Sequence, residues 1–292
     1  MSYAELLPEK NEDSNEINPL SVLSFLFWNL QEHELSNAVF QLVNDQELPE
    51  IVIFSETTQK SRIAIDNLLT PLGYTARIKP EGRVRVAVFD NIDSSNVIYT
   101  KKDQRFTSII YSLNTQNIMV TGVHLDSPAS YPDVDDRYFC AGAQYKLIES
   151  IEETFNVKKS IIIGDFNMNP FDKGMVSELS FKATHCKKTA QITKGNKRYF
   201  YNPSWGAFSN DLTLDDGKPP GTIHYVPFNK ETYVDYWHIF DQVLVRSELF
   251  SEYTNSFEVI TKTSTINLLN NEFIPDRERY SDHLPIKYKI KI

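Results

Sequence analysis

The sequence predicts a single mixed α/β domain, and three observations support this prediction. The chain opens with a strand, a helix, a strand and a helix; short alternating strands follow; and a helix leading into a buried strand then repeats the opening order. Its 292 residues are enough for one large core. No linker and no internal repeat of roughly 20–50 residues divides it. We expect one domain over residues 21–292, after a flexible polar leader over residues 1–20.

The first half of the chain changes pattern near residue 74. Apolar runs at residues 22–28 and 51–54 indicate buried strands, and residues 34–44 and 61–69 have the spacing of helices. Beyond them, Gly, Asp and Asn separate shorter strands, for which antiparallel hairpins are the better explanation. These predicted strands cover residues 74–79, 83–89, 96–99, 106–113 and 118–124.

The second half repeats the helix-to-strand order before it becomes irregular. Residues 136–155 predict a long helix that leads into a strand at 161–163, and a shorter helix is expected after Pro170. Residues 186–236 are rich in Pro, Gly, Asn and aromatic residues, so we expect a long irregular insertion there. The predicted closing strands cover residues 239–245, 257–261 and 286–290.

The composition excludes several classes of protein. The chain is 41% hydrophobic and 24% charged, which is typical of a globular protein. Its net charge of −9 means that binding to nucleic acid needs a local basic patch or bound cations. Two cysteines are too few for a disulfide framework or a thiolate zinc site. Without a signal-peptide pattern or a membrane-spanning stretch, we expect a soluble intracellular protein, cytoplasmic if bacterial, with no obligate protein partner evident.

Polar side chains of the kinds used in catalysis stand at the ends of the predicted strands. They are Asn29, Glu56, His124, Asp165, Asn167, Asp241, Asp282 and His283. Because strand ends of an α/β domain meet at one rim, these residues can form one composite site. Carboxylates hold divalent cations, and imidazoles move protons or stabilise charge. The set therefore suggests hydrolysis of a phosphate ester.

Each position has a simpler interpretation when it is taken alone. Asn29 and Glu56 are typical of solvated strand ends. The segment from Asp165 to Asn167 fits an Asx-type turn, and His283 fits a turn with a satisfied histidine. The ordered set favours a shared site over these separate interpretations.

The motifs, taken in order, resemble the endonuclease/exonuclease/phosphatase superfamily. They are Trp28-Asn29, Ser55-Glu56, Val123-His124-Leu125, Gly164-Asp165-Phe166-Asn167, Phe240-Asp241 and Ser281-Asp282-His283-Leu284-Pro285. The resemblance covers roughly residues 21–292 and is closest to the deoxyribonuclease and sphingomyelinase branches, which carry a second histidine like His124. It implies a DNase-like fold, a four-layer sandwich of two mixed β-sheets flanked by helices.

The resemblance also implies an oxygen-rich metal site. Glu56 would be the principal ligand of Mg²⁺ or Mn²⁺, and Asn29 and Asp282 would complete or support its shell. Hard cations of this kind prefer oxygen ligands and keep several waters, which suits so few protein groups.

The catalytic roles follow from the same resemblance. His283 would contact the scissile phosphate as a general acid/base or as a cation, and Asp241 would orient its ring. Asp165 would position or deprotonate the attacking water, and Asn167 would donate a hydrogen bond to a phosphoryl oxygen. His124 would face the phosphate and the leaving group.

The implied reaction is metal-dependent hydrolysis of a phosphodiester by in-line attack of water, with DNA or RNA as the favoured substrate. A small-molecule or lipid head-group phosphate is the alternative, and a catalytically inactive binding module is a weaker one. Lys197 and Arg198 end the densest basic run, and Tyr201 and Trp205 follow it. We expect these four to bind substrate, by tracking its phosphate backbone and stacking on its bases, although a packed or solvated loop explains them about as well.

Overall fold

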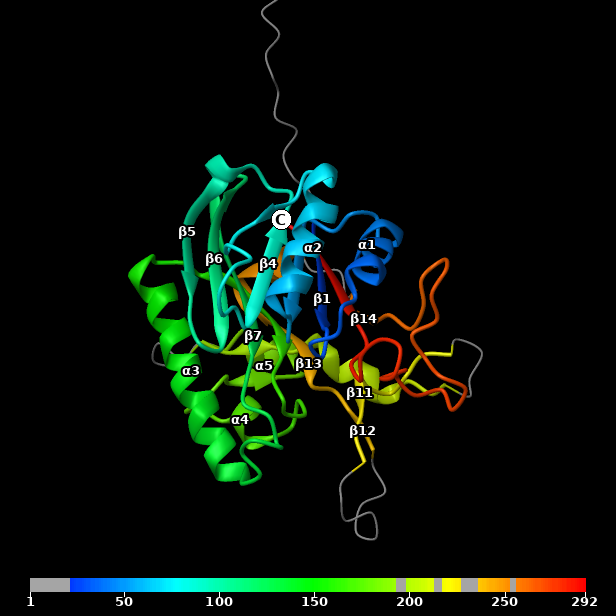
Figure 1. Ribbon diagram of the computed structural model, residues 1–292. Coiled ribbons are helices and arrows are strands. Elements are labelled where there is room, and N and C mark those ends of the chain that lie inside the picture. The colour runs from blue at the N-terminus through cyan, green and yellow to red at the C-terminus, as the bar shows by residue number, and fades with distance from the viewer. Residues whose placement is uncertain (1–21, 193–197, 213–216, 227–235, 253–255) are drawn as a thin grey trace, which may run out of the picture.

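Two large mixed β-sheets pack face to face between outer helices (Figure 1). The computed structural model describes residues 22–192, 198–212, 217–226, 236–252 and 256–292. The predicted four-layer α/β sandwich is therefore confirmed. The predicted leader, residues 1–20, lies outside the described residues.

The first sheet carries the N-terminal and C-terminal strands side by side, in the order β14-β15-β1-β2-β4-β3. β1 runs parallel to β2 and antiparallel to β15, and Asn29 is in register with Ser55. The end of β1 and the end of β2 therefore reach the same rim. The strands are β1 (Val22–Asn29), β2 (Ile51–Ser55), β3 (Thr75–Ala76), β4 (Val86–Asp90), β14 (Glu258–Val259) and β15 (Ile286–Lys291).

The second sheet has the order β5-β6-β7-β8-β13-β10-β9. β7 is parallel to β8, whereas β13 is antiparallel to β8. This register puts His124, Asp165 and Asp241 in one row across three strands. The strands are β5 (Val97–Lys102), β6 (Phe106–Leu113), β7 (Gln116–His124), β8 (Lys159–Asp165), β9 (Ala183–Thr184), β10 (Phe200–Tyr201) and β13 (Asp241–Arg246).

Helices cover the outer faces of both sheets (Figure 1). α1 and α2 lie together over the first sheet, and α3 packs against the second. The α-helices are α1 (Ser36–Asp45), α2 (Gln59–Leu69), α3 (Val134–Thr154), α4 (Lys173–Val176) and α5 (Lys187–Ala190). The 3-10 helices are η1 (Thr70–Leu72), η2 (Ser94–Asn96), η3 (Pro203–Ser209) and η4 (Ser247–Glu252). None of the helices described here is long and apolar enough to span a membrane.

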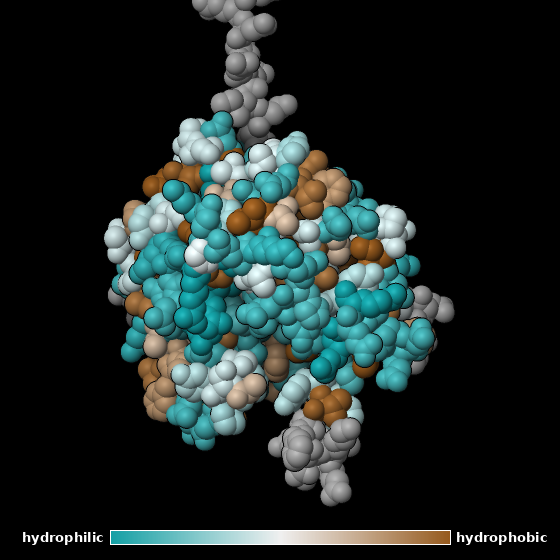
Figure 2. All heavy atoms as spheres, in the orientation of Figure 1, coloured by the Kyte–Doolittle hydropathy of each residue, from teal (hydrophilic) through white to brown (hydrophobic). Residues whose placement is uncertain are grey.

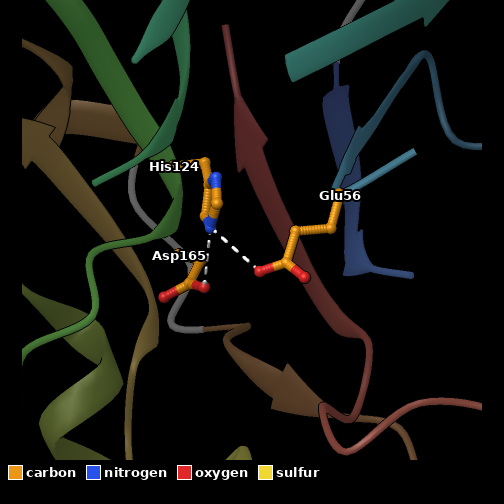
Figure 3. Close-up of side chains that lie close together, drawn as sticks. All are labelled: Glu56, His124 and Asp165. Carbon is orange, nitrogen blue, oxygen red and sulfur yellow. Dashed lines mark ion pairs between the residues drawn. The ribbon is translucent and has the colours of Figure 1, made fainter. Parts of the chain in front are cut away.

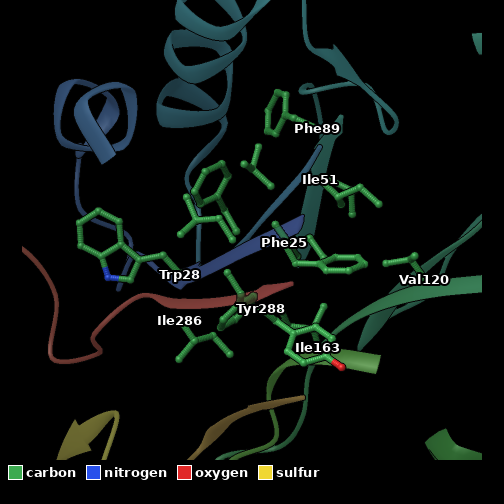
Figure 4. Packing of buried hydrophobic residues seen from close by; sticks show 14 of the residues in the cluster. Phe25, Trp28, Ile51, Phe89, Val120, Ile163, Ile286 and Tyr288 are labelled. Carbon is green, nitrogen blue, oxygen red and sulfur yellow. The ribbon is translucent and has the colours of Figure 1, made fainter. Parts of the chain in front are cut away.

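The core explains why the central strands are apolar on both faces. In β8, Ile161 and Ile163 face the first sheet and pack with residues such as Phe25 and Tyr288, as Figure 4 shows for Ile163. Ile162, between them, joins the separate cluster beneath α3. A strand buried on both faces needs apolar residues at every position, which the unbroken Ile run provides.

Residues 186–236, where we expected irregular structure, carry short elements in their described parts. β10 extends the second sheet by pairing with β13, and β11 (Ile223–His224) forms a hairpin with β12 (Trp237–His238). Two-residue strands are too short to produce a periodic pattern, so the sequence did not predict them.

Candidate active site

The strand ends bring the predicted polar residues to a single rim. Asn29 ends β1, and Glu56 follows β2 with a positive φ of 46°. The Glu56 carbonyl accepts a 2.7 Å hydrogen bond from the Glu32 amide. A left-handed glutamate costs conformational energy and persists only where its surroundings hold it, which is a common property of functional sites.

Glu56, His124 and Asp165 form one cluster (Figure 3). His124 Nε2 lies 3.1 Å from Glu56 Oε1 and 3.7 Å from Asp165 Oδ2. Asn29 Nδ2 donates to the same two carboxylates, at 3.1 Å to Glu56 Oε1 and 3.0 Å to Asp165 Oδ2. The amide therefore links two acids that come from different sheets.

His283, Asp241 and Asp165 form a second cluster that shares Asp165 with the first. His283 Nδ1 is 2.8 Å from Asp241 Oδ2, and its Nε2 is 3.9 Å from both Asp165 Oδ2 and Asp282 Oδ1. All but Asp282 are buried. One imidazole nitrogen is thus held by Asp241, and the other faces Asp165 and Asp282.

The Gly164-Asp165-Phe166-Asn167 motif has a local geometric cause. Gly164 has a φ of 151°, and a Cβ there would lie 2.1 Å from the Val123 carbonyl oxygen, so only glycine fits. The Asn167 amide donates to Asp165 Oδ1 at 2.8 Å, an Asx-type bond, while its side chain donates to Leu125 O at 3.1 Å. The turn interpretation is therefore correct, and the turn leaves Asp165 Oδ2 facing Asn29, His124 and His283.

The insertion holds His283 and Asp241 from the other side. Ile223 forms an isolated antiparallel bridge with His283, and the Leu284 amide donates to Thr222 O at 2.7 Å. The Asp241 amide donates to Thr222 Oγ1 at 3.1 Å. Sequence reasoning missed Thr222, because a threonine in an irregular stretch gives no signal of its position.

The site shifts the pKa values of its ionisable groups. Burial raises the pKa of Glu56, but His124, the Asn29 amide and the charge of His283 outweigh it and lower that pKa to about 2. Burial raises the pKa of Asp165 to about 6, with Asp241 adding to the rise. Burial lowers the pKa of His283, but the charges of Asp241 and Asp165 outweigh it and raise the pKa to about 10. Near neutral pH, His283 is therefore a cation beside carboxylates.

The donor groups fit a hard divalent cation. The carboxylates of Glu56 and Asp282 are each about a third exposed, at 32% and 30%, and both line the same pocket. Neither ring nitrogen of the buried His124 has a well-formed hydrogen bond within the described residues. Asn29 turns its amide oxygen towards the Gln31 amide, 3.0 Å away, and its NH₂ towards the acids. Carboxylate oxygens with solvent access are the ligands that Mg²⁺ and Mn²⁺ prefer.

The pocket at the rim is lined by both polar and apolar residues. Its volume is about 190 Å³. Glu56, Asn167, Asp282, His283 and Gln31 are among the polar ones. Gln31 Oε1 accepts a 3.2 Å hydrogen bond from the Asp282 amide. The other lining residues are Ser127, Pro128, Ala129, Ile223, Tyr225 and Phe240.

Two of the four predicted substrate-binding residues lie at the other end of the second sheet. Tyr201 is buried and in register with Val245, near the end of β13 that is distant from Asp241. Arg198 lies at the same end, where Nε and Nη1 lie 3.3 Å from Glu248 and 3.4 Å from Glu152. The structure does not bring these two to the rim, because β10 pairs with the end of β13 that is opposite Asp241.

Trp205, the third of the predicted substrate-binding residues, does not line the pocket at the rim. Trp205 packs on His185, Phe171 and Phe208, as a packed loop would. Lys197 lies outside the described residues.

Comparison with known proteins supports the fold. No family model matches the sequence, and no curated protein matches it. Solved structures do match. An endonuclease/exonuclease/phosphatase family protein from Bacteroides thetaiotaomicron superposes with a TM-score of 0.58 at 14% identity, covering 93% of this chain and 95% of that one. The chain thus has the fold of the endonuclease/exonuclease/phosphatase superfamily, as its motifs indicated.

Two further solved structures are similar to the chain. TDP2 of D. rerio, complexed with a single-strand DNA product, gives a TM-score of 0.55 at 14% identity over 93% of this chain and all (100%) of that one. A mannosyl-6-phosphatase of Bacteroides thetaiotaomicron gives 0.57 at 14% identity, covering 92% and 99%. At these identities, the similarity establishes the fold and not the substrate.

Proposed function

We propose that the protein is a divalent-metal-dependent phosphoesterase that hydrolyses phosphodiester bonds by direct attack of water. The observation that carries this proposal is the position of Asp165 Oδ2. Asn29 Nδ2 lies 3.0 Å from it, His124 Nε2 3.7 Å and His283 Nε2 3.9 Å. An acid and two imidazoles therefore face one point, where a water and a phosphate can meet.

The side chains suggest how the work is divided. Asp165, with its pKa raised to about 6, is suited to orient and deprotonate a water near neutral pH. His283, held as a cation by Asp241, can stabilise the developing negative charge and protonate the leaving group. His124 faces the same space from β7. A metal bound by Glu56 and Asp282, with the Asn29 NH₂ supporting the Glu56 carboxylate, would supply Lewis-acid stabilisation of the phosphate oxygens.

Nucleic acid is the substrate class that we favour. The TDP2 neighbour, whose structure contains a single-strand DNA product, supports it by analogy of fold. The alternative is a small phosphate ester, which the limited pocket volume of about 190 Å³ and the sugar-phosphatase neighbour favour.

A metal-dependent activity screen tests the proposal. Single-stranded DNA, double-stranded DNA, RNA, a sugar phosphate and bis(4-nitrophenyl) phosphate would be incubated with Mg²⁺ or Mn²⁺, and with EDTA. We expect turnover that EDTA abolishes and either metal restores. His283→Ala should remove it, and His185→Ala, at an exposed histidine, should not. Absence of turnover on every substrate with both metals would overturn the proposal.

A further inference from the structure

A cationic groove lies beside the candidate active site. Arg83, Arg85, Lys102 and Arg105 line it, together with Asp103 and Gln104, and its volume is about 650 Å³. A neighbouring pocket of about 280 Å³ shares Arg83 and Arg85 with the groove and has Glu56 in its wall. The groove therefore leads to the site from the Glu56 side. In Figure 2, hydrophilic residues cover the centre of the face, where Figure 1 places β4 and β7.

The positive charge of this groove is only partly balanced. Arg105 forms an ion pair with Asp126, and Lys101 lies 4.0 Å from Asp103. Among the ion pairs between described residues, none involves Arg83 or Arg85. In a chain of net charge −9, these two arginines therefore place positive charge beside an acidic site. They offer planar donors that match phosphate oxygens.

One buried side chain fixes the loop that carries these arginines. Arg62 of α2 is only 3% exposed, and its guanidinium donates to Thr57 O at 2.7 Å, to Pro80 O at 2.8 Å and to Gly82 O. Thr57 directly follows Glu56 in the chain. Arg62 thus links the loop before β4 to the segment after Glu56. Because its guanidinium donates to backbone carbonyls, we regard Arg62 as a positioning residue.

The opposite wall of the groove is tied to His124. The His124 amide donates to Arg105 O at 2.9 Å, and Lys102 Nζ donates to Arg83 O at 3.2 Å across the groove. Each wall therefore continues into a residue of the Glu56–His124–Asp165 cluster. A phosphate in the groove and a phosphate at Asp165 would be held at a fixed separation.

We propose that this groove binds a phosphate next to the scissile one, along a single strand of nucleic acid. This inference rests on the proposed function and narrows its substrate class. Every residue lining the groove is polar or charged, which suits a backbone of repeated phosphates and offers nothing to a lipid chain. A sugar monophosphate has no second phosphate to place there.

The experiment measures binding without turnover. A fluorescein-labelled single-stranded oligonucleotide is titrated in EDTA, at several salt concentrations, with the wild type and with the Arg83→Gln/Arg85→Gln variant. Counterion release predicts that the slope of log K against log[salt] becomes shallower by about 1.4, roughly 0.7 for each lost contact. We expect about tenfold weaker binding. The matched control, Lys146→Gln/Lys158→Gln, removes two exposed charges at other positions and should change neither quantity.

Activity then separates this inference from the proposed function. The fall in kcat/KM of the arginine variant should be about tenfold larger on the oligonucleotide than on bis(4-nitrophenyl) phosphate. An unchanged salt slope, or equally weakened binding in the lysine control, would contradict the proposal that the groove binds a phosphate. If the slope changes as expected but no phosphodiester is hydrolysed, the phosphate-binding role of the groove is supported and the proposed function fails. Thermal melting of both variants verifies that they are folded.

Discussion

The two ends of strand β13 each carry a buried ion pair, and they differ in how completely the charges around that pair are matched. At the far end, Arg246 meets Glu152 at 2.7 and 3.1 Å, and donates to Arg198 O at 2.7 Å and to the Tyr145 hydroxyl at 3.3 Å. Its guanidinium also lies over the Phe200 ring, 3.7 Å from the centroid. Two cations meet two anions there, because Glu152 lies between Arg246 and Arg198 and Arg198 also meets Glu248 at 3.3 Å. The hydrogen-bonding capacity of Arg246 is used.

The other end of β13 leaves its charges incompletely matched. Asp241 and Asp165 share one histidine, His283, and Glu56 lies across from them beside His124. Burial and the charge of Asp241 raise the pKa of Asp165, so part of this arrangement costs free energy in the folded protein. The comparison teaches that burial of an ion pair does not distinguish structure from function, whereas unmatched donors and acceptors do.

The largest effect is expected from Asp165→Asn. The variant keeps the shape of the side chain but removes the acid that faces both imidazoles, so activity should fall about 10³-fold. Because burial already disfavours the ionised carboxylate, the melting temperature should not fall. Steady-state kinetics and calorimetry on the same preparation measure both. An activity within tenfold of the wild type would contradict the contrast between the two ends of β13.

Glu152→Ala breaks the matched end instead. It leaves Arg246, 1% exposed, without its anion, and should lower the free energy of unfolding by about 3–5 kcal/mol. Urea unfolding measures this, and activity per folded molecule should be retained. The double variant Glu152→Leu/Arg246→Met is the control: it leaves no unpaired charge and should recover much of the loss.

Gly164→Ala tests how the backbone aims Asp165. The new Cβ would lie 2.1 Å from Val123 O at a φ that alanine avoids, so β7 and β8 must separate locally. We expect a loss of about 2 kcal/mol in stability and of about 10²-fold in activity. Gly206→Ala, where nothing lies within 4 Å of the added methyl group, is the control and should be nearly silent.

The smallest effect concerns Glu149 at the matched end. Burial raises its pKa, but the Tyr145 hydroxyl and Lys182, 3.1 Å away, lower it overall. A lowered folded-state pKa gives stability that is present above the unfolded value and lost as pH falls. Glu149→Gln should therefore cost about 0.5 kcal/mol at pH 7, discounted for partial exposure, and less at pH 3. A cost that grows on acidification would show that the carboxylate is not the stabilising form.

The strand ends of the site could be predicted because they leave a local signal. An apolar run followed by Asn29 or Asp165 reports both a buried strand and the point where it emerges. The order of the motifs, which resembles that of a known family, then predicted that residues from separate strands meet at one rim. The two clusters around Asp165 contain five of the eight selected residues: Glu56, His124, Asp165, Asp241 and His283.

The cationic groove could not be predicted in the same way. Arg83 and Arg85 stand in a hairpin, two residues apart and without a basic run, and Arg62 has the sequence context of an exposed helical charge. The dense basic stretch that drew the substrate prediction ends in Arg198, which is ion-paired at the far end of β13. Density of charge along a sequence does not report which end of a strand the charge will reach.

The contacts of Thr222 with Leu284 and Asp241 limit how this protein can be re-engineered. Its carbonyl and hydroxyl accept hydrogen bonds from Leu284 and Asp241, beside the histidine and aspartate that form the ion pair. A loop transplanted from a relative to change substrate preference would have to be joined outside the β11–β12 hairpin. Because Ile223 of β11 forms a bridge with His283, a junction placed inside the hairpin would change the position of the His283 ring. The segment is therefore part of the frame of the candidate site and not an exchangeable module.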